Sequence, residues 1–176
     1  MNYQSKIHSI RKNNVVTIYV PNFCLNELSQ KFTLDIINTL EKINTDTSID
    51  MVILRTVQEN YFLPKFPIDD KSFSANKILK SDYFIKLTQM IQNMRAMTVA
   101  VIEGTANFIS SSFLKAYDLS YATENTAFTN KLNINSSELF SAKQAEDLGL
   151  ITRVVPTDKI DITLDYLINT YTVEDE

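Results

Sequence analysis

Residues 98–128 read TVAVIEGTANFISSSFLKAYDLSYATENTAF, and this stretch decides the fold prediction. It opens with a short apolar, β-branched run, residues 99–102, and Gly104 then predicts that a buried strand ends in a turn. A small-polar loop follows, after which the apolar residues recur at helical spacing from Ser110, and residues 119–122 return to a strand pattern. The predicted helix N-terminus carries unpaired N–H groups and a positive dipole end, which suit a developing negative charge.

Toward the N-terminus the same alternation of strand and helix continues. Residues 15–20 predict a strand that Pro21 ends, and residues 51–54 predict another. Between them, Asn26 is a candidate cap for a helix. The core stripe expected on that helix is Leu28, Phe32, Ile36, Leu40 and Ile43. Residues 81–94 predict a second amphipathic helix, which leads into the strand at residue 99.

Toward the C-terminus the local signals are sharper. Ser141 and Gln144 have the spacing of a capping box, and Gly149 suits the left-handed position after a helix. Residues 151–155 predict a strand, and residues 159–171 predict a last helix. Its expected apolar stripe is Ile160, Leu164, Leu167, Ile168 and Tyr171. The alternation predicts an α/β protein in which residues 1–176 form a single domain.

Composition narrows the classes of function. The chain has 176 residues, of which 44% are hydrophobic, enough for one domain with a real core. A net charge of −4 argues against a nucleic-acid or anionic-membrane surface, which needs clustered Lys and Arg. The single cysteine, Cys24, excludes an intrachain disulfide and favours a reducing compartment. With no apolar signal segment or membrane-spanning run, we expect a cytoplasmic protein.

Two stretches carry a family resemblance. The first is the order of Glu103-Gly104, Asp118 and Ala122-x-Glu124-x-x-x-Phe128 in the stretch quoted above. The second, residues 140–156, reads FSAKQAEDLGLITRVVP and follows the pattern Ser-Ala-x-x-Ala-x-x-x-Gly-Leu-Val-x-x-Val-Val-Pro without a gap. Together they resemble the crotonase (enoyl-CoA hydratase/isomerase) superfamily over about residues 15–156. The resemblance implies a ββα spiral, with the C-terminal trimerisation helices of the family largely missing.

The resemblance also implies where a ligand would bind. In crotonases two backbone N–H groups form an oxyanion hole for an acyl-thioester enolate, and these positions correspond here to Phe66 and Ile109. The family's Leu-Asn-x-Leu element corresponds to residues 25–28, which implies that Cys24 and Leu25 lie beside the thioester cofactor. Where the family has a run of three glycines, this chain has Phe108, Ile109 and Ser110.

The paired catalytic glutamates of the family do not occur here. In an ungapped alignment they correspond to Ser112 and Leu132, and neither can act as a general base in that role. The weak carboxylate candidates are Asp69 and Asp70, which follow the Phe66 loop, and Glu138.

Two other chemistries have little support in the sequence. His8 is the only histidine, and we expect a surface or edge residue rather than a member of a Ser/His/Asp triad. One His and one Cys leave no spacing typical of a metal site, so we predict no metal.

Two hypotheses follow from these observations. The chain is either a non-catalytic relative that serves as an interaction or auxiliary subunit, or a divergent isomerase or decarboxylase acting on a CoA- or carrier-protein-linked acyl thioester. The first needs no cofactor and accounts for the joint loss of both glutamates and the glycine run. The second needs only the backbone N–H groups. Either way we expect a homo-oligomer of the trimer type or a partner protein chain, because the last helix leaves apolar surface.

Overall fold

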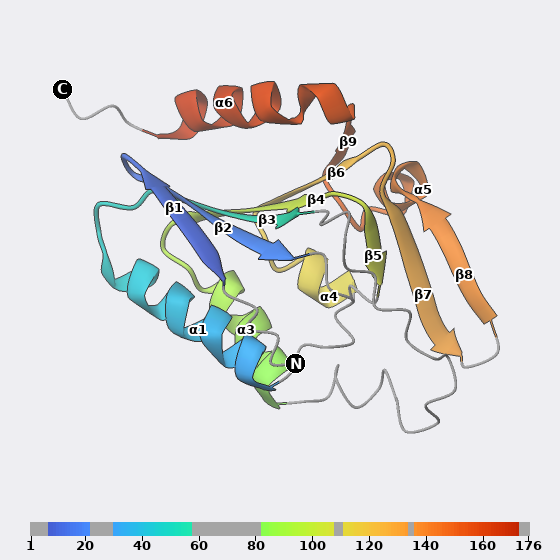
Figure 1. Ribbon diagram of the computed structural model, residues 1–176, viewed down its shortest axis with the longest axis horizontal. Helices are drawn as coiled ribbons and strands as arrows, with labels where there is room; N and C mark the ends of the chain where they lie inside the picture. Colours follow the sequence, from blue (N-terminus) through green and yellow to red (C-terminus); the bar gives the residue numbers. More distant parts are fainter. Residues whose placement is uncertain (1–6, 22–29, 58–81, 108–110, 134–135, 173–176) are drawn as a thin grey trace, which may run out of the picture.

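A six-stranded sheet forms the centre of the protein in the computed structural model, which describes residues 7–21, 30–57, 82–107, 111–133 and 136–172 (Figure 1). Its strands follow the order β1 (His8–Lys12), β2 (Val15–Pro21), β3 (Met51–Val57), β4 (Met97–Ile102), β6 (Leu119–Thr123) and β9 (Arg153–Val155). β1 pairs antiparallel with β2, and each later pair of neighbours is parallel. Parallel neighbours need crossover connections, and the crossover helices α1 and α3 lie on one face of the sheet, whereas α6, which follows the last strand, lies on the other.

A second, three-stranded sheet stands beside the first, as Figure 1 shows. It contains β5 (Thr105–Asn107), β7 (Ala127–Asn133) and β8 (Ser136–Ser141), with β7 parallel to β5 and antiparallel to β8. The prediction of a loop after Gly104 is therefore wrong for residues 105–107. These strands were hard to predict because they are short or polar, and the pairing with their neighbours overrides weak propensity.

Two helices cover one face of the six-stranded sheet, which we call the two-helix face. They are α1 (Gln30–Thr45) and α3 (Asp82–Gln92); α3 lies within the predicted range 81–94, and α1 lies between the two predicted strands. The buried part of the predicted α1 stripe is Ile36, Leu40 and Ile43, while the proposed cap Asn26 lies outside the described residues. α1 and α3 pack on side chains of β2, β3 and β4 in one core cluster.

One helix, α6 (Ile160–Tyr171), covers the opposite face, which we call the one-helix face. A short 3₁₀ turn, Thr157–Lys159, precedes it. Ile160, Leu164 and Leu167 are buried against the sheet as predicted, but Tyr171 is 58% exposed, so its place in the stripe is wrong. Within the described part of the chain, no helix is long and apolar enough to cross a membrane.

Two short helices join the sheets. α4 (Ser111–Leu114) precedes β6, and α5 (Ala142–Asp147) follows β8. The capping box is confirmed: the Gln144 backbone N–H donates to Ser141 Oγ over 3.2 Å, and the Ser141 N–H donates to Gln144 Oε1 over 2.8 Å. Gly149 has a φ of 64°, as predicted for the residue that ends α5. This part of the chain therefore folds as its local signals predict.

Candidate site at the carboxyl edge of the sheet

The carboxyl ends of β2, β3 and β4 meet at one edge of the six-stranded sheet. Pro21 at the end of β2 pairs with Val57 at the end of β3, and β3 pairs in turn with β4. Residues 22–29 follow β2, residues 58–81 follow β3, and residues 108–110 follow β5. Ligands of open parallel sheets bind outside the carboxyl ends of the strands. This edge is therefore the candidate site, because residues 22–29 and 58–81, two of the segments predicted to bind a thioester, start there.

The residues predicted to bind the ligand themselves fall in those segments. Cys24, Leu25, Phe66 and Ile109 all lie outside the described residues. Asp69 and Asp70 do so as well, so their roles stay predictions. The structure shows that two of these segments, residues 22–29 and 58–81, begin at the carboxyl edge of the six-stranded sheet.

The other predicted positions have a described backbone. Ser112 belongs to α4, directly after residues 108–110. Leu132 belongs to β7, in the irregular part of its pairing with β8 between Asn130 and Asn133. Glu138 belongs to β8, opposite Asn130. The two positions assigned to the family glutamates thus lie on two different elements.

An ion-pair network lies at this edge, and the sequence reasoning missed it. Arg55 of β3 donates from Nε to Glu103 Oε2 over 2.6 Å and from Nη2 to Glu103 Oε1 over 3.2 Å. Its Nη1 donates to Asp161 Oδ1 of α6 over 2.6 Å. The hydrogen bonds from Arg55 to Glu103 and, with less effect, to Asp161 raise the pKa of the guanidinium above its ordinary value. Both Glu103 oxygens are engaged by the guanidinium, which disfavours a role in proton transfer.

Glu103 is held at its backbone as well. Its N–H donates to Thr56 Oγ1 over 2.7 Å, and its carbonyl lies 3.3 Å from the same hydroxyl. The network therefore ties the end of β3, where residues 58–81 begin, to the end of β4, which leads into β5. Two opposite charges next to apolar runs on neighbouring strands are the signal that could have revealed it.

Asp118 makes hydrogen bonds that hold two neighbouring strands together. Its Oδ2 accepts from the Thr98 N–H over 2.7 Å and from Thr98 Oγ1 over 2.9 Å. In return, the Asp118 N–H donates to Thr98 Oγ1 over 3.1 Å. These bonds fix the start of β6 against β4, on the side of the sheet away from the candidate site. Asp118 therefore stabilises the sheet rather than contacting a ligand.

His8 lies opposite Tyr19 of β2, which pairs in turn with Arg55 of β3. It belongs to β1, the edge strand, where all five residues are exposed, and its ring centroid is 6.1 Å from that of Tyr19. The expectation of a surface or edge histidine is confirmed. Among the described residues, no three His, Cys, Asp or Glu side chains come together in a way that could hold a metal ion.

Comparison with solved structures identifies the class of fold. An enoyl-CoA hydratase from Mycobacterium smegmatis superposes with a TM-score of 0.72 at 18% identity, covering 94% of this chain and 76% of that one. An enoyl-CoA hydratase from Bacillus halodurans gives a TM-score of 0.73 at 15% identity, covering 94% of this chain and 79% of that one. No protein-family model and no curated protein matches the sequence at a significant level. The chain has the crotonase fold, as the sequence resemblance predicts.

Proposed function

We propose that this chain is a crotonase-fold protein without hydratase activity that serves as an interaction or auxiliary subunit. In this proposal it works in the cytoplasm, as a homo-oligomer of the trimer type or beside a partner chain. The single cysteine supports a reducing compartment. A fold alone does not define a function, so the proposal depends on the residues at the site.

The observation that carries the proposal is the identity of Ser112 and Leu132. Hydration of an enoyl thioester needs two carboxylates that move protons to and from water and carbon, together with a donor pair for the enolate oxygen. The alignment places the two carboxylates at Ser112 in α4 and Leu132 in β7. Neither side chain can take or give a proton at neutral pH, and a serine without a histidine partner is not activated.

Retention of the scaffold supports the same view. The bonds between Asp118 and Thr98 and the capping box at Ser141 are present. The three core clusters contain buried residues from both sheets and from α1, α3, α5 and α6. Packing and turn positions of the family pattern therefore persist where the catalytic positions do not, a combination expected of a relative kept for its surface.

A second candidate function is an isomerase or decarboxylase acting on an acyl thioester linked to coenzyme A or a carrier protein. Backbone N–H groups at Phe66 and Ile109 would stabilise the enolate, because such groups survive side-chain substitution. The observation in its favour is that residues 58–81, which carry Phe66, follow β3 at the carboxyl edge, where ligands of parallel sheets bind. Its proton-transfer candidates are Asp69, Asp70 and Glu138.

The test is the absorbance loss of a short enoyl thioester in the presence of purified protein, with an active enoyl-CoA hydratase as positive control. We expect no rate above background, since losing one well-placed proton-transfer group typically costs about 10² to 10⁴ in rate and two are missing here. A second measurement titrates a non-reactive acyl-thioester analogue by calorimetry. We expect no saturable binding.

Other outcomes would favour the alternatives. Robust hydration would contradict the proposal, and Asp69→Asn, Asp70→Asn and Glu138→Gln would then show which carboxylate acts. The matched control for those variants is Asp158→Asn, whose side chain is 78% exposed beside α6. Saturable binding of the analogue without hydration would favour the isomerase or decarboxylase instead.

A further inference from the structure

β1 is an open edge of the six-stranded sheet. It comes first in the order of the strands, and among the described residues only β2 pairs with it (Figure 1). All five of its residues are exposed. An edge strand presents unpaired N–H and C=O groups, which can pair with another extended chain. The outer side of β1 is therefore a candidate docking site for a strand.

The other edges of the two sheets are shorter or less regular. β5 and β9 have three residues each. β8 has six, but its pairing with β7 shifts in register between Asn130 and Asn133. β1 pairs with β2 at five consecutive positions. Because main-chain hydrogen bonds hold an added strand, the longest regular edge, that of β1, suits one best.

The hairpin turn indicates which residues of β1 turn their backbone groups outward. Residues 13–14 form the turn between Lys12 and Val15, and a turn of this length is closed by a bond from the first C=O to the fourth N–H. Lys12 therefore directs its backbone groups toward β2. These directions alternate along an antiparallel strand, so Ser9 and Arg11 direct theirs away from β2. An added strand would meet the N–H and C=O groups of these two residues.

The side chains at this edge favour an acidic strand with an apolar residue at its centre. Lys12 makes no ion pair with any residue in the described part of the chain, whereas Arg11 pairs with Asp46 over 2.7 Å. The sequence has no acidic residue before Glu27. Ile10 is 48% exposed. Since residues opposite one another on paired strands have Cβ atoms about 5 Å apart, an added strand should carry a carboxylate opposite Lys12 and an apolar side chain opposite Ile10.

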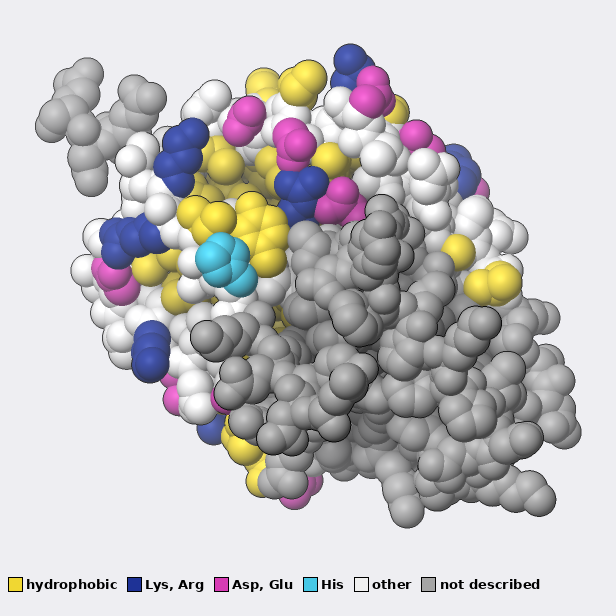
Figure 2. Space-filling view, in the orientation of Figure 1, with side chains coloured by type: hydrophobic (Ala, Val, Ile, Leu, Met, Phe, Trp, Pro, Cys, Tyr) yellow, Lys and Arg dark blue, Asp and Glu magenta, His cyan; other side chains and the backbone are white. Residues whose placement is uncertain are grey.

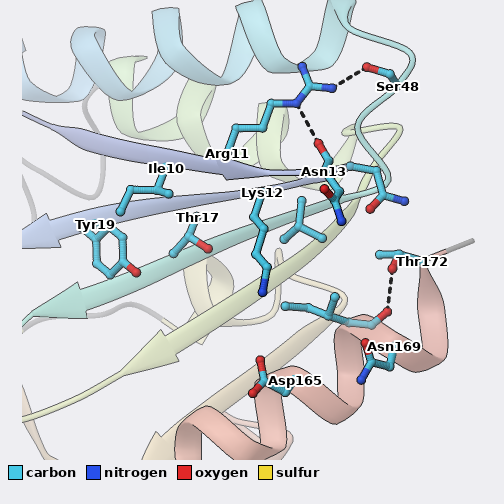
Figure 3. Close-up of a pocket in the computed structure, with 13 residues that line it drawn as sticks. Ile10, Arg11, Lys12, Asn13, Thr17, Tyr19, Ser48, Asp165, Asn169 and Thr172 are labelled. Carbon is cyan, nitrogen blue, oxygen red and sulfur yellow. Dashed lines mark hydrogen bonds between the residues drawn. The ribbon is translucent and has the colours of Figure 1, made fainter. Parts of the chain in front are cut away.

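A groove of about 1040 Å³ lies beside this edge, between α6 and the first two strands (Figure 3). Ile10 and Lys12 line it from β1, Thr17 and Tyr19 line it from β2, and Asp165 lies on the α6 wall. The side chains from the strands point toward α6 across the groove, and Figure 2 shows hydrophobic and charged side chains together along this strip. Every second side chain of an added strand would lie on this face, where the groove leaves room for it.

The charges of β1 disfavour a second copy of β1 as the added strand. Another copy would bring its own Arg11 and Lys12 and no carboxylate on that strand. Lysine on an edge strand is one of the devices by which proteins avoid edge-to-edge pairing with themselves. A carboxylate on a different chain would instead meet an unpaired cation.

We propose that the outer edge of β1 docks an extended segment of a partner protein, which adds one more strand to the six-stranded sheet. The segment places an acidic residue opposite Lys12 and an apolar residue opposite Ile10. This inference rests on the interaction role proposed above and names the chemistry of one partner. The two fail separately: hydration of an enoyl thioester would overturn the role, whereas the docking site is tested by peptide binding alone.

A synthetic peptide with the core Glu-Thr-Val-Thr-Glu tests the docking site. Its symmetry places a glutamate opposite Lys12 and the valine opposite Ile10 in either strand direction. Fluorescence anisotropy of the labelled peptide, titrated with the full chain at low salt, should show saturable binding. Replacing the valine by proline removes an N–H and should weaken binding at least about tenfold. No saturable binding, or equal binding of the proline peptide, would overturn the proposal.

Hydrogen exchange followed by mass spectrometry locates the bound peptide. We expect slower exchange in fragments that contain residues 8–12 when the acidic peptide is present, because amides of the open edge become hydrogen-bonded. Protection that spares these residues and falls on β8 or β9 would overturn the proposal.

A proline in the strand tests the backbone contact from the side of the protein. Ser9→Pro removes an outward N–H, which an edge strand tolerates, and should weaken peptide binding at least about tenfold. The matched control, Ser9→Ala, keeps the N–H and should leave the dissociation constant unchanged. Circular dichroism confirms that both variants are folded. Equal affinities would overturn the proposal, and so would a change in oligomer mass caused by Ser9→Pro alone, since a second copy would then occupy this edge.

Charge exchange tests the register and does not depend on the proline variant. Lys12→Glu should weaken binding of the acidic peptide about fivefold at low salt. A peptide in which lysines replace both glutamates should bind Lys12→Glu more tightly than it binds the parent chain. The matched control is Arg153→Glu, which changes an exposed cation on β9 at the opposite edge of the sheet and should have no effect. Equal affinity of the lysine peptide for the parent chain and Lys12→Glu would overturn the proposal.

Discussion

The two faces of the six-stranded sheet differ in how completely the chain covers them. On the two-helix face, Val16, Ile18 and Val20 of β2 are all buried beneath α1 and α3. On the one-helix face the alternate residues of the same strand are Val15, Thr17 and Tyr19, and only Val15 belongs to the buried core. Thr17 and Tyr19 line the groove instead. One strand therefore has a fully apolar side and a mixed side.

The difference shows what decides the pattern of a strand. Successive side chains of a strand point to opposite faces of the sheet. Alternate residues of β2 therefore match how well each face is covered by helices. Where two helices cover the sheet, each position is apolar. Where the cover of α6 ends, the positions become amphipathic, as expected for a face of a sheet that is only partly covered.

The largest effect should come from a truncation on the two-helix face. Ile37→Ala removes most of an α1 side chain that is 0% exposed in the core of the two-helix face, and we expect a loss of about 4 kcal/mol in the free energy of unfolding. Leu164→Ala on α6, where the side chain is 6% exposed, should cost about 2 kcal/mol, because the single helix can shift to fill the space. Urea unfolding followed by circular dichroism measures both.

A matched control separates burial from helix propensity. Ile85→Ala on α3 makes the same chemical change at a site that is 44% exposed, so it should alter the free energy of unfolding by less than about 0.5 kcal/mol. If Ile37→Ala and Leu164→Ala cost the same, the two faces are equally well packed and the contrast drawn above is wrong.

Much of the fold could be predicted because its signals are local. The stripe of α3, the capping box at Ser141 and the left-handed Gly149 each depend on residues within a few positions of one another. β5 and the β7–β8 hairpin were missed because residues such as Thr105 and Asn130 have no apolar alternation, and only pairing across the second sheet makes them strands.

The candidate site was harder to predict for a physical reason. Arg55 and Glu103 are 48 residues apart in the sequence, and only the parallel pairing of β3 with β4 brings them together. The same holds for the groove, since neither β1 nor α6 shows in its own sequence that the helix covers only part of the sheet. Contacts between distant segments depend on the topology, which periodicity does not reveal.

We expect a smaller loss in the free energy of unfolding when a partner of Arg55 is removed, at the point where the one-helix face meets the candidate site. Glu103→Ala removes the bidentate partner of Arg55, both side chains being about one fifth exposed, and should cost about 2 kcal/mol in the free energy of unfolding. Asp161→Ala should cost less than about 1 kcal/mol, because that carboxylate is 75% exposed and Arg55 keeps Glu103. Thermal unfolding at neutral pH compares the two. Equal costs would mean that α6 depends on Arg55 as much as β4 does.

The smallest expected change in the free energy of unfolding is an increase, and it concerns a buried polar atom on the two-helix face. The hydroxyl of Tyr117 is buried and has no hydrogen-bond partner among the described residues, and its ring lies edge-on to Phe113 at 5.4 Å between centroids. A buried hydroxyl without a partner costs about 1 to 3 kcal/mol. Tyr117→Phe should therefore raise the free energy of unfolding at pH 7 by about 1 kcal/mol, while Tyr166→Phe, whose side chain is 72% exposed, should change nothing.

The pH dependence of this effect has a definite sign. Burial raises the pKa of Tyr117 above its ordinary value of about 10, so the folded state keeps the phenol proton under conditions in which the unfolded chain releases it. The stability tied to that proton is fully present below about pH 10 and is lost as the pH rises beyond it. The advantage of Tyr117→Phe over the parent chain should therefore grow above pH 10, as urea unfolding at a series of pH values would show. A variant less stable than the parent at pH 7 would mean that the hydroxyl has a partner, and that the two-helix face is packed around it.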